Sequence, residues 1–255
     1  MTEKVSRMIK ALQDLSAELL CATEEDYIDK IIPYLEQECN DFKWSYDAGI
    51  SKFVIIIRGE DQVIKVPFHQ LFEAEDYDAD LSYYNSGKAP EDMEEPKEEN
   101  YYHSFYEACN IQLVNEDDLL EFKGDDYCEV ECALYLKADE ENLGQYFASE
   151  TWAADAGDTC IYLQQRVTPF EAQYDNPWRN RTMEQNMATK RRCEKLGVRC
   201  FNAVWIEDFF DAYGDQEFQR LGKFLEHYNI YDFHDGNLGY YNGLPVLLDY
   251  SNFNE

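Results

Sequence analysis

The C-terminal stretch of the chain gathers oxygen-bearing side chains of the kind that hold metal ions. Asp232 stands five residues before Asn237, and Asp249 closes the apolar segment that follows. Within that segment the Asn242-Gly243 pair predicts a tight β-hairpin, which brings the three side chains to one end of a short ribbon. Magnesium prefers oxygen ligands and takes few of them from proteins, so the stretch predicts a magnesium site for a polyphosphate. The alternative role of both aspartates is turn capping at strand ends.

A lone lysine interrupts an apolar strand in the first third of the chain. The runs 53–57 and 62–67 are rich in β-branched residues and are separated by a turn at 59–61, so both predict strands. Lys65 stands inside the second run, where a lysine can still extend its ammonium group to solvent. Its position is unusual enough to make it a candidate site residue.

A second hairpin and a connector are expected farther along the chain. Strands at 146–148 and 159–163 flank a polar turn and would complete a small antiparallel sheet. Residues 164–167 then connect this sheet to the rest of the chain, and Thr168-Pro169 ends the strand because proline cannot donate to a ladder.

Helices are expected before, within and after these strands. Residues 2–40 predict two helices that pack on a neighbouring lobe, because apolar residues recur there at helical spacing. The same spacing predicts helices at 125–141, 203–210 and 217–227.

The chain is strongly acidic, with a formal net charge of −31. Such a charge argues against direct nucleic-acid binding and fits either plain solubility or a surface that imitates a polyanion. Residues 73–99 form an acidic run and predict a mobile insertion outside the core. Residues 179–199 are a basic island, which would act as an internal counter-charge or as a docking patch for an acidic substrate or for the insertion.

The sequence predicts a cytoplasmic protein with free thiols. Its eight cysteines include no C-x-x-C pair, so buried thiols in a reducing compartment are the simplest interpretation. A run of about 18 uncharged apolar residues, as a membrane span needs, does not occur. The N-terminus also lacks the apolar region of a signal peptide.

Taken in order, these motifs resemble the protein-kinase-like fold. The loop 232–237 (D-F-H-D-G-N) is similar to the D-x-H-x-x-N loop of its bacterial and small-molecule branch, and Val63-Ile64-Lys65 is similar to the V-A-I-K strand. The likeness covers residue 42 onward and implies an α+β, bilobal protein of a minimal bacterial or phage type. The implied divisions are N-terminal helices at 1–40, a sheet lobe with one helix and the acidic insertion at 41–166, and a truncated helical lobe at 167–255.

The resemblance implies ATP and magnesium as ligands and assigns catalytic roles. Asp232 would orient or deprotonate the hydroxyl of an acceptor, which is an unidentified protein or small molecule. Lys65 would contact the α- and β-phosphates, and Glu131 would fix Lys65 in place, with Glu129 as a competing partner. Either glutamate could instead be a solvated surface acid.

The remaining implied roles concern the nucleotide and the metal. Gly49 and Ser51 would belong to a loop that covers the phosphates, and Gln164 and Arg166 to the connector that meets the adenine edge. Asn237 and Asp249 would hold magnesium on the β- and γ-phosphates, which is the charge neutralisation that phosphoryl transfer needs.

The sequence also departs from the family pattern. Ile230 and Tyr231 replace the usual residues before the aspartate, and Asp249-Tyr250-Ser251 replaces D-F-G. The chain runs only to Glu255, so an activation segment and the helices that usually bind a peptide acceptor are not expected. Two hypotheses follow. The first is an ATP- and magnesium-dependent phosphotransferase, which the retained site residues favour. The second is an impaired pseudoenzyme or acidic decoy, of use in phage–host conflict, that binds a host protein.

Overall fold

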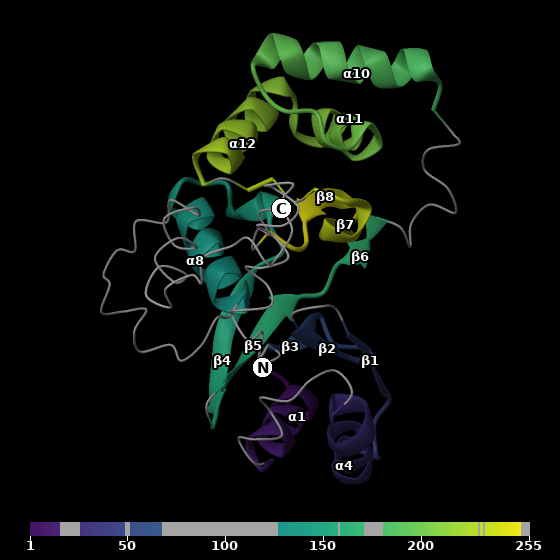
Figure 1. Cartoon of the computed structure of the whole chain (residues 1–255), viewed down its shortest axis with the longest axis vertical. Coiled ribbons are helices and arrows are strands. Elements are labelled where there is room, and N and C mark those ends of the chain that lie inside the picture. Colours follow the sequence, from purple (N-terminus) through teal and green to yellow (C-terminus); the bar gives the residue numbers. More distant parts are fainter. Residues whose placement is uncertain are drawn as a thin grey trace, which may run out of the picture.

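The protein has an α+β fold built around a five-stranded antiparallel sheet (Figure 1). The strands are β1 (Trp44–Ala48), β2 (Lys52–Ile57), β3 (Gln62–Pro67), β4 (Glu150–Ala156) and β5 (Thr159–Gln165), in the order β1-β2-β3-β5-β4. The structure, a computed structural model, describes residues 1–15, 26–48, 52–67, 127–157, 159–170, 181–228, 230–231 and 233–250. The strands predicted at 53–57 and 62–67 are confirmed, whereas the acidic run at 73–99 lies outside the described residues.

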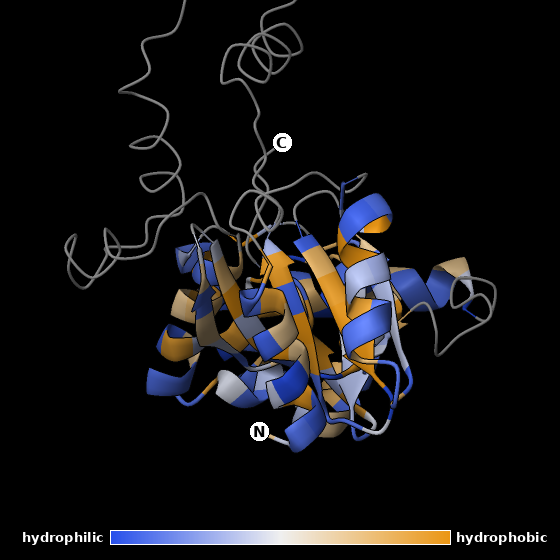
Figure 2. Cartoon of the chain, turned by 90° about the horizontal axis from the view of Figure 1, so that it is seen from below, coloured by the Kyte–Doolittle hydropathy of each residue, from blue (hydrophilic) through white to orange (hydrophobic). Residues whose placement is uncertain are grey.

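One face of the sheet packs against the N-terminal helices. Helix α1 (Glu3–Gln13) and helix α4 (Ile32–Glu38), which continues a π-helical turn at Tyr27–Ile31, lie beneath the sheet (Figure 1). Side chains alternate along a strand, so Phe53, Ile55 and Ile57 of β2 point to this face and join the core with the apolar stripe of α1. Figure 2 shows mainly hydrophobic residues along the strands and hydrophilic ones on the outward helix surfaces. The expectation of helices within residues 2–40 is confirmed for the described residues.

The opposite face of the sheet is covered by helix α8 (Tyr127–Glu140). Two sides of this helix are buried, because Cys128 and Cys132 contact β5 residues of the sheet while Val130, Leu134 and Ala138 enter a second core. A helix with two apolar sides lies between two packed layers. Helix α8 therefore joins the sheet to the C-terminal half of the chain.

The second core lies among the C-terminal helices and a small sheet. The helices are α10 (Met183–Leu196), α11 (Ala203–Tyr213) and α12 (Asp215–His227), and the strands are β6 (Thr168–Pro169), β7 (Leu238–Tyr241) and β8 (Leu244–Leu247). Helix α11 packs against β8, and α10 and α12 pack against α11 (Figure 1). Aromatic rings fill the centre of this core. The rings of Phe209 and Phe218 pack edge to face there, with their centroids 5.3 Å apart. The helices predicted at 203–210 and 217–227 are confirmed.

The tight β7–β8 hairpin is confirmed, including its turn. Asn242 and Gly243 have φ angles of 51° and 80°, the positive values that a two-residue hairpin turn requires. Glycine reaches such angles without strain, and asparagine tolerates them better than most residues. The turn therefore returns β8 alongside β7 and brings Asp249 back toward Asn237.

One local prediction was wrong, and another was correct but incomplete. Residues 146–148 are not a strand, because Tyr146 ends a 3-10 turn and β4 begins only at Glu150. The apolar character of this run reflects burial in the second core, where Tyr146 and Phe147 pack against Phe209 and Phe224. The predicted end of the strand before Thr168-Pro169 is confirmed, because β5 stops at Gln165. The sequence did not predict that this dipeptide pairs with β7 as the short edge strand β6. An edge position suits proline, which lacks an N–H donor.

The basic island is partly an internal counter-charge. Arg192 of α10 pairs with Glu207 at 3.3 Å and with Asp215, and its guanidinium lies 3.8 Å from the ring centroid of Phe210. These contacts fasten α10 to α11 and α12. Lys190 and Arg191 on the same helix are exposed.

None of the helices in the described part of the chain has the length and apolar character needed to cross a membrane.

The second core should respond very differently to the loss of a buried and of an exposed leucine. We expect Leu221→Ala on α12, whose side chain is fully buried, to lower the free energy of unfolding by about 2–5 kcal/mol, because it leaves a cavity. Leu136→Ala on α8 is the matched control, since Leu136 is 61% exposed and its loss should cost no more than about 0.5 kcal/mol. Urea-induced unfolding measures both effects, and an equal loss of unfolding free energy in the two variants would contradict the packing of α12 in this core.

Candidate functional site

The strand lysine is buried between two glutamates. Lys65 Nζ lies 2.5 Å from Glu131 Oε2 of α8 and 2.8 Å from Glu150 Oε2 of β4. Both glutamates and the lysine are buried, so Lys65 does not extend to solvent. Of the two α8 glutamates expected as its partner, Glu131 is the one placed at hydrogen-bond distance from Lys65.

A second lysine, which sequence reasoning did not assign to the site, completes the cluster. Lys52 Nζ lies 3.0 Å from Glu131 Oε1 and 3.0 Å from Asp249 Oδ2. Glu131 therefore uses one oxygen for each lysine and links β2, β3 and the segment after β8. We call Lys52, Lys65, Glu131, Glu150 and Asp249 the charge cluster.

Strand register places these groups together. Lys65 is opposite Val54 of β2 and Tyr162 of β5, and Glu150 is opposite Gln164. Because side chains alternate, Lys52 and Lys65 point away from the face that carries Phe53 and Ile64, and so toward α8. The apolar residues of the same strands hold the opposite face against α1 and α4. Period-two alternation thus gives one sheet an apolar face and a face with charged groups.

The segment after β8 is fixed by backbone bonds and by one aromatic anchor. The N–H groups of Leu248 and Asp249 donate to the carbonyl oxygen of Asn237 at 2.9 and 3.4 Å. Tyr250 is buried, donates its hydroxyl to Ala148 O at 2.8 Å and packs edge to face on Phe147. Two of the three residues expected to hold magnesium or order the acceptor, Asn237 and Asp249, are therefore neighbours.

Gln164 ties this segment to the sheet. Its Nε2 donates to Glu150 Oε2 at 2.8 Å and to Leu248 O at 2.8 Å. Within the described residues, Gln164 Oε1 and Glu150 Oε1 are buried and have no hydrogen-bond partner. Buried acceptors usually have a donor, so this edge of the cluster has capacity for a water molecule or a ligand N–H group.

The groups of the cluster shift one another's pKa values. Burial opposes the ammonium form of Lys65, but Glu131 and Glu150 outweigh it and raise the pKa of Lys65 above its usual value. Asp249 and Glu131 likewise raise the pKa of Lys52 well above that of free lysine, against the effect of burial. The pKa of Asp249 is itself raised, mainly by burial and by the nearby Glu131, although Lys52 acts in the opposite direction. Three carboxylates share two ammonium groups, so the fully ionised cluster keeps one excess negative charge.

Cys128 adds a possible metal ligand beside the glutamates. Its sulfur and one oxygen each of Glu131 and Glu150 lie within 4.8 Å of one another. However, the ammonium group of Lys65 already bridges the two glutamates at 2.5 and 2.8 Å. The cation that these carboxylates hold in this structure is therefore a lysine.

The remaining predicted site residues are Arg166, Gly49, Ser51 and Asp232, and the structure does not place them in the charge cluster. Arg166 is exposed and lies at the β2–β3 turn, where its backbone N–H donates to Asp61 O at 2.8 Å. Its guanidinium faces the carbonyl oxygens of Ile57 and Glu60, so it is not part of the charge cluster. Gly49, Ser51 and Asp232 lie outside the described residues.

The loop that follows position 232 is anchored from α11. Asn202 begins this helix, where its side-chain oxygen accepts from two backbone N–H groups, and its Nδ2 donates to Asp235 Oδ1 at 2.7 Å. Phe233 stacks on Phe201 with ring centroids 4.2 Å apart. The sequence offered a signal for Asn202, since asparagine before an apolar helix is a preferred N-cap. It offered none for the bond to Asp235.

Comparison with known proteins adds no family assignment. No protein-family model matches the sequence, and a search of curated proteins found no significant match.

Glu131→Gln and Asp249→Asn each remove a charge from the cluster, but they should change the free energy of unfolding differently. We expect Glu131→Gln to lower the free energy of unfolding by about 3–5 kcal/mol, because two buried lysines lose their shared partner. On the same helix, Glu140→Gln removes an exposed carboxylate that pairs with Lys137 and should cost at most about 1 kcal/mol.

We expect Asp249→Asn, in contrast, to be as stable as the wild type or more stable at neutral pH. The raised pKa of Asp249 means that the folded chain binds this proton more tightly than the unfolded chain. The ionised carboxylate therefore costs stability, and the difference from Asp249→Asn should shrink as pH falls through the folded-state pKa, which lies above 3.8. Urea unfolding across pH measures this. A loss as large as that of Glu131→Gln would identify Asp249 as a structural ion-pair partner instead.

Proposed function

We propose that this chain is a phosphotransferase of protein-kinase-like architecture that binds ATP with magnesium. The observation that carries the proposal is the buried pair of Lys65 and Glu131, with Asp249 joined to the same glutamate through Lys52. A helix glutamate that fixes a strand lysine beside a metal-binding aspartate is the arrangement that kinase-like phosphoryl transfer uses.

The arrangement of the two cores supports the proposed bilobal architecture. One core lies between the five-stranded sheet and the N-terminal helices, and the other lies among α8, the C-terminal helices and the β7–β8 hairpin. The charge cluster draws its members from both sides, because Lys52, Lys65 and Glu150 come from the sheet and Asp249 follows β8. In the proposal, nucleotide phosphates bind where these parts meet.

The donor groups fit magnesium. Asn237 and Asp249 offer amide and carboxylate oxygens, the ligands that magnesium takes from proteins, and the backbone places the two residues side by side. A cation already lies against Asp249, namely the Lys52 ammonium at 3.0 Å, which would have to yield to the metal or share the carboxylate with it. The bound metal would neutralise the β- and γ-phosphates.

The chain's own residues would supply positioning and charge. Lys65 is held by two carboxylates, so its ammonium group is oriented before a phosphate arrives and loses little conformational freedom on binding. Lys52, on the strand after the expected phosphate-covering loop, is a second cation for the phosphates. Gln164 Oε1 and Glu150 Oε1, which have no partner among the described residues, could accept a ligand N–H group. Asp232 would orient the acceptor hydroxyl.

A second candidate function is an impaired, kinase-like interaction protein. The ion pair between Lys52 and Asp249 favours it, because a stable pair would keep the metal ligand engaged. The net charge of −31 also suits a protein that acts through an acidic surface. Here the cluster would serve as a structural link, and a host protein would be the partner.

Calorimetry of ATP binding with and without magnesium tests the proposal. We expect magnesium-dependent binding, weakened about tenfold or more by Asp249→Asn and by Lys65→Met, because each removes a charged contact to the phosphates or their metal. Lys190→Met, which removes an exposed lysine of α10, is the control and should bind like the wild type. Thermal melting of each variant separates lost binding from lost fold.

The outcomes distinguish the two candidates. Magnesium-dependent binding together with phosphate transfer to an added acceptor supports the phosphotransferase. Binding without transfer to any acceptor class would favour the pseudoenzyme. Failure to bind millimolar ATP in a folded wild-type protein would overturn the nucleotide site.

A further inference from the structure

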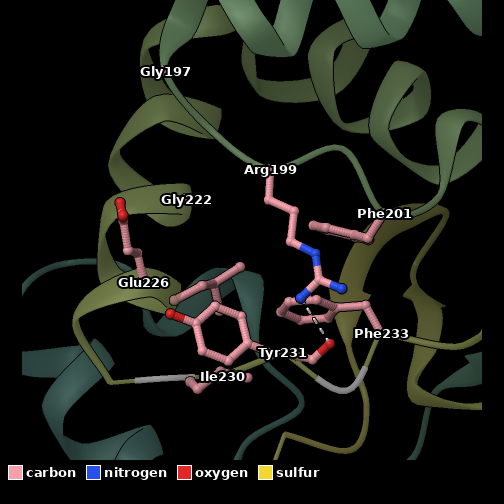
Figure 3. Close-up of a pocket in the computed structure, with 9 residues that line it drawn as sticks. Gly197, Arg199, Phe201, Gly222, Glu226, Ile230, Tyr231 and Phe233 are labelled. Atoms are coloured by element: carbon pink, nitrogen blue, oxygen red, sulfur yellow. Dashed lines mark hydrogen bonds between the residues drawn. The ribbon is translucent and has the colours of Figure 1, made fainter.

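A cavity on the C-terminal helices lies apart from the charge cluster. Its volume is about 130 Å³, and it is a partly open hollow bordered by α12, by the loop between α10 and α11, and by the segment after α12 (Figure 3). Phe201, Leu225, Ile230 and Phe233 make its walls largely apolar. No member of the charge cluster lines it, and two of its lining residues, Tyr231 and Phe233, stand on either side of Asp232 in the chain.

Two glycines allow the α10–α11 loop to form one wall. Gly197 ends α10 in the left-handed conformation, with φ of 68°, which favours glycine. At Gly222 of α12, a Cβ atom would lie 2.4 Å from Cγ1 of Val198. Because Gly222 has no side chain, the loop can approach α12 closely and then carry Arg199 and Phe201 to the cavity.

Arg199 gives the cavity a positive charge. Figure 3 shows its guanidinium reaching from the loop toward Tyr231 and Phe233, with Glu226 pointing elsewhere. One Nη donates to Tyr231 O at 3.3 Å, and the guanidinium carbon lies 5.5 Å from the centroid of that ring. No carboxylate of the described residues forms an ion pair with Arg199, although the chain as a whole is strongly acidic. Since a guanidinium has five N–H donors, this one has donors to spare for an anion.

The volume of the cavity and its lining residues indicate which kind of ligand it can hold. A dry, apolar cavity of roughly 150 Å³ accommodates benzene, so the cavity here matches a single six-membered ring. The stacked rings of Phe201 and Phe233, at 4.2 Å, and the side chain of Leu225 offer apolar contact to a flat body. We propose that this cavity binds a small compound made of one flat ring with a carboxylate or a phosphate group, with the ring against Phe201 and Phe233 and the anion on Arg199.

Cys200 provides a reporter inside the same loop. It stands between Arg199 and Phe201 in the chain, and its sulfur accepts a hydrogen bond from the thiol of Cys193 in α10, which lowers the pKa of Cys200. A lowered pKa increases the share of thiolate, the form that alkylating agents attack. A ligand that orders the loop should slow alkylation of Cys200, which mass spectrometry of its peptide can follow.

Titration with three matched probes tests the proposal. Benzoate and phenyl phosphate carry the anion on a ring, and benzyl alcohol carries a neutral group on the same ring. We expect both anions to bind in calorimetry and to slow iodoacetamide modification of Cys200. Benzyl alcohol should bind with an affinity at least about tenfold lower, because it lacks the charge. The ratio between benzoate and phenyl phosphate then tells which anion the site prefers.

Substitutions of arginine identify the contact. We expect Arg199→Leu to weaken both anions about tenfold or more while leaving benzyl alcohol unchanged, because only the charge-assisted bonds are lost. Arg191→Leu removes an exposed arginine of α10 outside the cavity and should bind both anions like the wild type. Arg199 is exposed, so its replacement should not unfold the chain, and thermal melting verifies this.

Three results would overturn the proposal: no binding of either anion at millimolar concentration, equal binding of benzyl alcohol, or unchanged anion affinity in Arg199→Leu. ATP binding is measured on the same variants. Loss of anion binding in Arg199→Leu with ATP binding intact would show that the two sites are independent.

Discussion

The rest of the structure depends on the sharing of one buried carboxylate by two lysines. Glu131 accepts from Lys65 with one oxygen and from Lys52 with the other, and it also accepts weakly from the backbone N–H of Tyr250 at 3.4 Å. These three contacts join β2, β3 and the segment after β8 to helix α8. A buried glutamate with no cation would be costly, so the two strands, the helix and the tail are held in one arrangement. Because the ionised cluster keeps one excess negative charge, its charge balance favours a metal cation, which phosphates could then accompany.

The sheet can carry this cluster because its two faces have different tasks. Phe53, Ile55 and Ile64 hold the apolar face against α1 and α4, which supplies hydrophobic stabilisation without involving the charged face. Helix α8 then covers Lys52 and Lys65 with a glutamate of its own. Tyr250 fastens the segment that carries Asp249. Stability and candidate chemistry are thus divided between the faces of the same strands, as enzymes often separate scaffold from site.

The sequence predicted those parts of the structure that leave a local pattern. Strands β2 and β3, helix α12 and the Asn242-Gly243 hairpin follow from periodicity and turn chemistry, and Lys65 is conspicuous because it interrupts an apolar run. Lys52 and Glu150 could not be placed, because their burial depends on how β2, β3, β4 and β5 align, and register between distant strands is not written in any single segment. The sequence predicts a strand at 146–148 that the structure does not contain, because an apolar triplet alone does not distinguish a buried strand from other buried backbone. The cavity at Arg199 arises where a loop meets a helix, so only tertiary structure reveals it.

The most direct test of the nucleotide-site account is to locate a bound metal–nucleotide complex by NMR. Manganese in place of magnesium broadens the signals of nearby nuclei, so backbone spectra recorded with manganese and a non-hydrolysable ATP analogue report where the complex sits. The account predicts selective broadening at Lys52, Asn237 and Asp249 that exceeds the broadening by manganese alone, with Arg191 of α10 unaffected. Broadening spread evenly over acidic surface residues, or concentrated away from the charge cluster, would contradict it.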